Sequence, residues 1–139
     1  MSDEGCRPRP HHGALQGLRI SLVCGAVYDF IFAAVALLAP GLPEQLLGLR
    51  QPGDPYFIWL IAVFLCMLGG FYLFAAYDPR SYRGNIDVAI VGRTLGFVAM
   101  GYAAHRDPTL SGLWVLALSD LAFAAAHAWF WLPIRKHGP

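Results

Sequence analysis

Residues 86–104 read IDVAIVGRTLGFVAMGYAA, an apolar run that carries an arginine, Arg93, near its centre. A run of about 20 apolar residues is the length at which a helix crosses the hydrocarbon core of a bilayer. A guanidinium at that depth costs about 2.5–3.5 kcal/mol even on lenient insertion scales. The run is therefore typical of a membrane-spanning helix whose charge needs a partner inside the protein.

Three further apolar runs have a similar length, and two of them also hold an interior charge, Asp29 or Asp120. Hydrophobic residues make up 57% of the chain and charged residues 14%, against about 45–50% and 25% in soluble domains. We therefore expect an all-α fold, an integral membrane four-helix bundle at residues 18–134, and we exclude a soluble enzyme. The predicted spans are residues 20–39, 56–77, 86–104 and 110–132.

The segments outside the spans are short. Residues 1–17 are polar and predict a disordered N-terminal tail, because the next apolar run is too long for a signal peptide and lacks a small-residue cleavage site. Residues 135–139 form a C-terminal tail. The stretch 43–48, PEQLLG, begins with proline and ends with glycine. It predicts one or two helical turns that lie on the outer membrane surface.

Basic residues give the orientation, since Arg50 and Arg106 face one side and seven others face the opposite side. By the positive-inside rule both termini are cytoplasmic. We expect a multi-pass protein of the plasma (inner) membrane of a bacterium, with Trp129 and Trp131 at the inner interface. The net charge of +1 and the lack of a basic stripe exclude nucleic acid as a partner. The seven basic residues on the predicted cytoplasmic side are Arg7, Arg9, Arg19, Arg80, Arg83, Arg135 and Lys136.

The three interior charges are expected to meet. Counted from the cytoplasmic ends of their spans, Asp29 lies about ten residues in, Arg93 about seven and Asp120 about twelve, which places them within roughly 8 Å along the membrane normal. Charges that face lipid separately are costly, so we predict that Arg93 pairs with Asp29, Asp120 or both. His127 lies two turns beyond Asp120 on the same face, and Tyr72 is a candidate from the second span.

Gly92 and Gly96 flank Arg93 in a G-x-x-x-G pattern. Such a pattern lets a second helix approach closely. We therefore assign both glycines to helix packing.

Two carboxylates and one guanidinium leave an excess of one negative charge. In a medium of low dielectric, a shared proton, a protonated His127, a bound cation or a donor ligand can resolve that excess. This imbalance makes Asp29, Arg93, Asp120, His127 and Tyr72 candidate ligand-binding residues. The alternative is that the ion pairs only hold the helices in register.

Metal binding is not expected, and the cofactor is unknown. Di-iron bundles use Glu-x-x-His spacing, which does not occur here. Cys6 with His11 and His12 matches no standard zinc pattern. Cys24 and Cys66 lie within spans, where we expect them to act as small apolar fillers.

A family resemblance accompanies these features. The arginine followed by glycine in the third span (Arg93 and Gly96), the GGFY run at residues 69–72 and the short turns resemble the small four-span bacterial membrane proteins of the DoxX-like type. The resemblance covers the whole chain through its architecture. It implies a redox-linked or accessory role.

Three functions remain open. The first is an accessory or lipophilic-ligand-binding protein, alone, as a homo-oligomer or in a larger membrane complex. The second is an intramembrane enzyme for a lipid-soluble substrate such as an isoprenoid or quinone, with Asp29 or Asp120 as general acid or base and Arg93 holding an oxyanion. The third is a proton- or cation-coupled carrier, which at four spans requires an oligomer.

Overall fold

The computed structural model describes residues 11–50 and 53–135, and within these ranges every regular element is helical. Four of the helices are long and apolar enough to cross a membrane. The all-α fold is therefore confirmed, and so is the number of helices that could cross a membrane. The long helices are α1 (His11–Leu38), α3 (Pro55–Tyr77), α4 (Arg83–Arg106) and α5 (Leu113–Arg135), and the short ones are α2 (Leu42–Leu47) and η1 (Pro108–Leu110).

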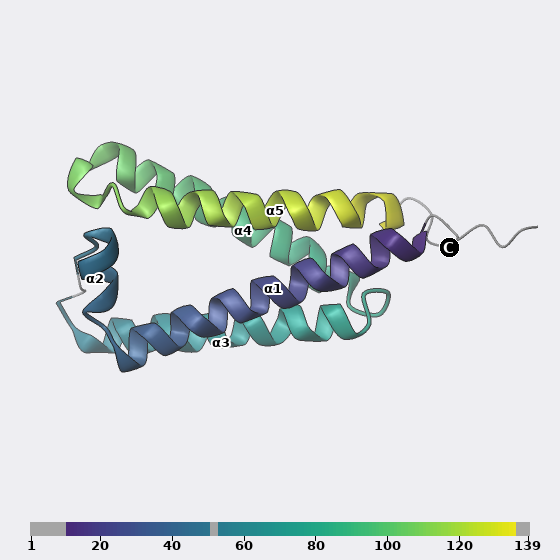
Figure 1. The fold of residues 1–139 in the computed structure, drawn as a ribbon, viewed down its shortest axis with the longest axis horizontal. Coiled ribbons are helices and arrows are strands. Elements are labelled where there is room, and N and C mark those ends of the chain that lie inside the picture. Colours follow the sequence, from purple (N-terminus) through teal and green to yellow (C-terminus); the bar gives the residue numbers. More distant parts are fainter. Residues whose placement is uncertain (1–10, 51–52, 136–139) are drawn as a thin grey trace, which may run out of the picture.

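The long helices form two pairs that meet along α1 and α5 (Figure 1). Helix α1 packs against α3, and α4 packs against α5. The start of α1, the end of α5 and the turn between α3 and α4 all lie at one end of the bundle. Helix α2 lies across the opposite end, between the two pairs. The first and last spans, which carry the two interior aspartates, are therefore neighbours.

Several helix boundaries differ from the predicted spans, including both ends of α4 (Arg83–Arg106). Helix α1 begins at His11, so residues 11–17 are helical and do not belong to a disordered tail; residues 1–10 lie outside the described ranges. Helix α5 begins at Leu113 instead of residue 110, because Pro108–Leu110 forms a separate 3-10 turn, and it continues to Arg135. Residues 136–139 of the predicted C-terminal tail also lie outside the described ranges.

Aspartates organise the two tight turns. The Ser81 hydroxyl donates to Asp78 at 2.5 Å, and the backbone N–H groups of Ser81 and Arg80 donate as well. These bonds lower the pKa of Asp78, with the Ser81 hydroxyl contributing most. The hydroxyl and backbone N–H of Thr109 lower the pKa of Asp107 in the same way. Each Asp-Pro pair therefore ends one helix and fixes the turn that follows.

The predicted helical turns at residues 43–48 are confirmed as α2. Pro43 lies in its first turn, where a missing N–H does no harm. Gly48 ends it with a φ of 64°, a left-handed conformation that glycine adopts without strain. No residue of α2 is buried.

The outward faces of the spans are apolar. Ile31, Phe64, Leu95 and Leu118 are each more than half exposed, and no more than 28% of the most apolar window of any span is buried. Soluble monomers rarely expose apolar patches of more than a few hundred Å², so these faces fit contact with lipid. Cys24 and Cys66 belong to this exposed surface. Our prediction that they fill the interior was wrong.

Small residues allow α1 and α3 to approach each other. Ala26 and Ala33 of α1 and Ala62 and Ala75 of α3 are at most 2% exposed. Without a hydrophobic driving force between helices in lipid, close packing of this kind is what stabilises their association. The α1–α3 pair is therefore stabilised mainly by close packing of complementary helix surfaces.

Larger side chains fill the bundle near the chain ends, where Leu18, Leu22, Ile86 and Trp131 form one core. Trp131 is 1% exposed, and its Nε1 donates to Asp87 Oδ1 at 2.9 Å. Trp131 is therefore buried inside the bundle, where Asp87 of α4 accepts its indole N–H, and its position at the level of the inner interface stays a prediction. Trp129, which is 77% exposed, faces outward.

Replacing Ala26 with leucine tests the α1–α3 contact. The added side chain has no room at a fully buried position, so we expect Ala26→Leu to lower the free energy of unfolding by about 1–3 kcal/mol. Val27→Leu is the matched control, because Val27 is 49% exposed. Thermal unfolding in detergent, followed by circular dichroism, measures both. Equal stability of the two variants would contradict the packing described here.

Candidate functional site

Arg93 pairs with both aspartates. Its Nη2 donates to Asp29 Oδ1 at 2.6 Å, and its Nη1 donates to Asp120 Oδ1 at 2.5 Å. The exposed fractions of the three side chains are 7% for Arg93, 1% for Asp29 and 13% for Asp120. The predicted ion pairing of Arg93 is confirmed, and it involves both aspartates. We call Asp29, Arg93 and Asp120 the charge cluster.

Three aromatic rings surround the guanidinium. Its Cζ lies 5.3 Å from the ring centroids of Tyr28 and Tyr72 and 5.1 Å from that of Phe123. A cation over a ring face within about 6 Å is attracted by the ring quadrupole, and more strongly where both are desolvated. Because the rings come from α1, α3 and α5, the Arg93 side chain on α4 contacts each of the three other long helices.

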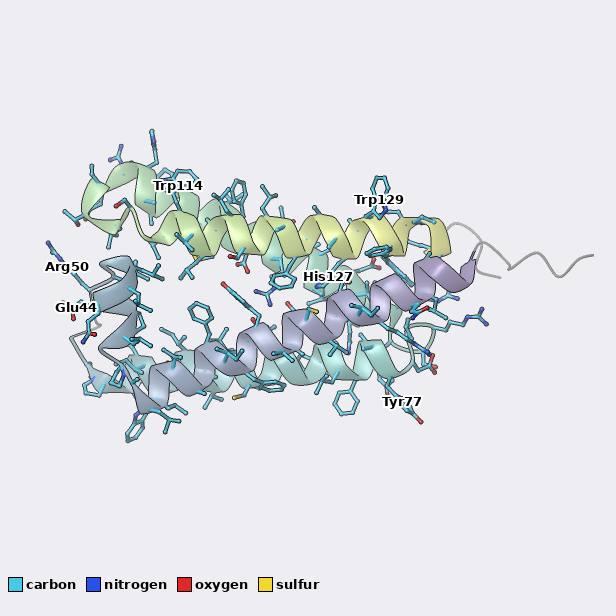
Figure 2. The ribbon with its side chains drawn as sticks, in the orientation of Figure 1. Glu44, Arg50, Tyr77, Trp114, His127 and Trp129 are labelled. Carbon is cyan, nitrogen blue, oxygen red and sulfur yellow. The ribbon has the colours of Figure 1, made fainter. Side chains whose placement is uncertain are left out.

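His127 is fully buried between α5 and α1 (Figure 2). Its Nδ1 lies 3.0 Å from Ser21 Oγ, and that hydroxyl donates to the Leu18 carbonyl at 2.9 Å. When the Ser21 hydroxyl donates to the Leu18 carbonyl, its oxygen accepts a hydrogen bond from Nδ1–H of the matching His127 tautomer. In a neutral imidazole, Nε2 then carries a lone pair and is an acceptor.

Polar atoms without a partner gather around this site. Among the described residues, Asp29 Oδ2, Arg93 Nε and His127 Nε2 are buried and form no hydrogen bond. A buried polar atom left unsatisfied costs about 1–3 kcal/mol. Two of the three are acceptors, so a donor group placed beside Asp29 or His127 would lower the free energy of the site.

An apolar cavity of about 280 Å³ lies toward the α2 end of the bundle. Its lining includes Phe32, one helical turn beyond Asp29, and Leu116, one turn before Asp120. The Phe32 ring lies 4.8 Å from that of Tyr28, which in turn contacts Arg93. The volume is close to the lower end of the range for small-molecule pockets, about 300–1,000 Å³.

The antiparallel helices α1 and α5 place these features in one order. Followed from the α2 end of the bundle, both helices pass the cavity first, the charge cluster second and the Ser21–His127 pair last. The interior therefore changes from apolar to charged to neutral polar over a few helical turns. Such a gradient suits an amphiphilic molecule with one polar end.

The two glycines predicted for helix packing differ. A Cβ atom added at Gly96 would collide with Asp120 Oδ2, whereas a Cβ at Gly92 would meet nothing within 4 Å. Gly96 thus makes room for the carboxylate that pairs with Arg93. Gly92 contacts no neighbouring helix within the described ranges, and a packing role against a second copy stays a prediction.

All five predicted ligand-binding residues lie together: Asp29, Arg93 and Asp120 form the charge cluster, and Tyr72 and His127 adjoin it with rings 5.9 Å apart. The sequence interpretation missed Phe123, Ser21 and Gly25. Ser21 and Gly25 precede Asp29 at successive intervals of one helical turn, so this spacing could have identified them. Gly25 contributes its carbonyl, which accepts from Arg93 Nη2 at 3.4 Å.

Metal-binding groups and known relatives give no further guide to the chemistry. Within residues 11–50 and 53–135, no group of three or more His, Cys, Asp or Glu side chains could hold a metal ion. No family model, curated protein or solved structure matches the chain. A function therefore has to be argued from the site itself.

Gly96→Ala and Gly92→Ala form a matched pair that tests the charge cluster. The alanine at position 96 displaces the Asp120 carboxylate from Arg93, so we expect the free energy of unfolding to fall by up to about 3–5 kcal/mol, the cost of breaking a buried ion pair. Alanine at position 92 meets nothing and favours the helix by about 1 kcal/mol. Thermal unfolding in detergent measures the difference. Equal effects of the two substitutions would show that the Asp120 carboxylate does not need the space beside Gly96.

Proposed function

We propose that the chain is a multi-pass membrane protein whose interior binds a small lipophilic molecule with a hydrogen-bond-donating polar end. The apolar body of the ligand lies in the cavity between Phe32 and Leu116. Its polar end meets the charge cluster, with Asp29 Oδ2 as the acceptor. The observation that carries the proposal is an unpartnered buried carboxylate oxygen one helical turn from an apolar cavity.

The charge balance supports a ligand over a purely structural role. An ion pair that only holds two helices together needs one carboxylate for one guanidinium, yet Arg93 has two carboxylate partners. The second carboxylate leaves excess negative charge at a site that is nearly closed to solvent. A hydroxyl or N–H group on a ligand stabilises that charge by donating to it. His127 Nε2 offers a second acceptor for a polar end that reaches past the cluster.

The membrane placement is argued from the apolar outer faces and from the distribution of charge. Arg19 and Arg83 lie at the end of the bundle that holds both described chain ends, whereas Arg50 and Arg106 lie at the other end. We place the first end in the cytoplasm by the positive-inside rule and α2 at the outer surface of a bacterial plasma membrane. An accessory role agrees with the resemblance to DoxX-like proteins.

Reporter fusions test this orientation. Alkaline phosphatase is active only outside the cytoplasm, so we expect it to be inactive when fused at the C-terminus and active when fused after Arg50. Green fluorescent protein should give the opposite pattern. Phosphatase activity at the C-terminus would reverse the proposed orientation, and fluorescence from both fusion sites would contradict membrane insertion.

Native mass spectrometry of protein purified in mild detergent tests ligand binding. We expect the wild type to carry a small molecule, and Leu116→Trp to lose it because the indole fills the cavity. Leu118→Trp is the control, since Leu118 is 56% exposed. Asp29→Asn should weaken retention about tenfold, because an amide offers the ligand a poorer acceptor than a carboxylate.

The outcomes separate the candidate functions. Circular dichroism first establishes that each variant is folded. A wild type without a bound molecule, or equal retention in the two tryptophan variants, would contradict the proposal. A molecule that the wild type converts and Asp29→Asn holds unchanged would instead identify Asp29 as a general acid or base of an intramembrane enzyme.

A further inference from the structure

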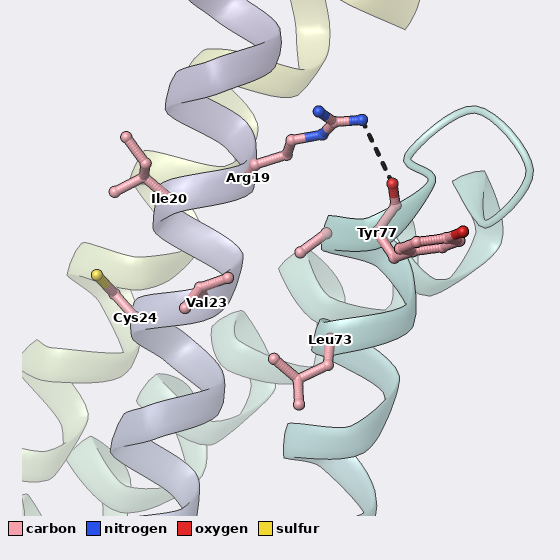
Figure 3. Close-up of a pocket in the computed structure, with 7 residues that line it drawn as sticks. Arg19, Ile20, Val23, Cys24, Leu73 and Tyr77 are labelled. Carbon is pink, nitrogen blue, oxygen red and sulfur yellow. Dashed lines mark hydrogen bonds between the residues drawn. The ribbon is translucent and has the colours of Figure 1, made fainter.

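A second apolar groove lies on the outside of the bundle, between α1 and α3 (Figure 3). It has a volume of about 460 Å³, and no residue of the charge cluster lines it. Its apolar lining includes Ile20, Val23 and Leu73, which are 56%, 41% and 43% exposed. In the proposed orientation, this groove faces the lipids of the cytoplasmic leaflet.

Arg19 extends across one end of the groove. Its Nη2 donates to the Tyr77 carbonyl at 3.3 Å, so the guanidinium links α1 to the last turn of α3 (Figure 3). One N–H is used in this bond, and a guanidinium has several more. Arg19 forms no ion pair with a described residue. The nearby Asp78 carboxylate already accepts from Ser81 and Arg80.

We propose that this groove binds an anionic phospholipid, with its phosphate at Arg19 and an acyl chain along Val23 and Leu73. Charge at one end and apolar surface along the rest match an amphiphile. The exposed Tyr77 ring marks the same level as the membrane interface, where lipid phosphates lie. Anionic lipids of the cytoplasmic leaflet are attracted to basic residues at this level. The inference rests on the proposed membrane placement but not on the proposed interior ligand.

Lipid titration followed by native mass spectrometry tests the proposal. Delipidated protein in detergent receives phosphatidylglycerol or phosphatidylcholine with the same acyl chains. We expect several-fold more phosphatidylglycerol than phosphatidylcholine to be retained by the wild type. Arg19→Gln should abolish this preference, whereas Arg83→Gln, at the same end of the bundle but outside the groove, should keep it. Equal binding of the two lipids, or equal losses in the two variants, would overturn the proposal.

Two further variants separate lipid binding from the stability of α3. Arg19→Lys keeps the charge and should keep the preference for phosphatidylglycerol. A preference that instead falls in parallel with the melting temperatures of the lipid-free variants would mean that Arg19 only caps α3.

Val23→Trp fills the groove and should reduce retention of both lipids. Val98→Trp on α4, where Val98 is 56% exposed, should not. Equal retention in these two variants would also overturn the proposal. The interior ligand appears as a separate mass in the same spectra, so its absence is distinguishable from failure of the groove.

Discussion

The guanidinium of Arg93 determines how the four spans meet. In a medium of low dielectric it cannot face lipid, so α1 and α5 bring Asp29 and Asp120 to it, and α3 contributes the Tyr72 ring. Removing one partner from such a buried pair costs about 3–5 kcal/mol, a large part of a typical stability of about 5–15 kcal/mol. Small residues hold α1 to α3, but a charge holds that pair to α4 and α5.

The same interaction divides the interior into regions of different polarity. Near the chain ends the space is filled by Leu18, Leu22 and Trp131, and Ser21 fixes the hydrogen bonding of His127. Toward α2 the two pairs, together with α2 and its flanking loops, line a partly open apolar cavity. The charge cluster lies between these regions. This gradient would orient the proposed amphiphilic ligand, because only one direction places its polar end at the carboxylates.

The position of each residue along the bundle could be predicted from the sequence, but the direction in which its side chain points could not. Counting residues from the span ends was sufficient to bring Asp29, Arg93 and Asp120 together, because rise along a helix is constant. Each residue also turns the helix by about 100°, and only contrast between polar and apolar faces reveals that angle. In a membrane span the outer face is as apolar as the inner one. Cys24 was therefore assigned to the interior although it is exposed, whereas Asp29, Arg93 and Asp120 were correctly predicted to meet.

The two ends of the bundle are closed in different ways, and this difference bears on the proposed ligand. The end near the chain termini is sealed by a buried core that includes Ile86 and Trp131. The opposite end is covered by α2, which buries none of its own residues. Because α2 has no fully buried residue and packs only lightly against the long helices, we expect its movement to cost less free energy than opening the core. A lipophilic molecule bound between Phe32 and Leu116 would therefore enter and leave more readily at the α2 end, which is the outer end in the proposed orientation.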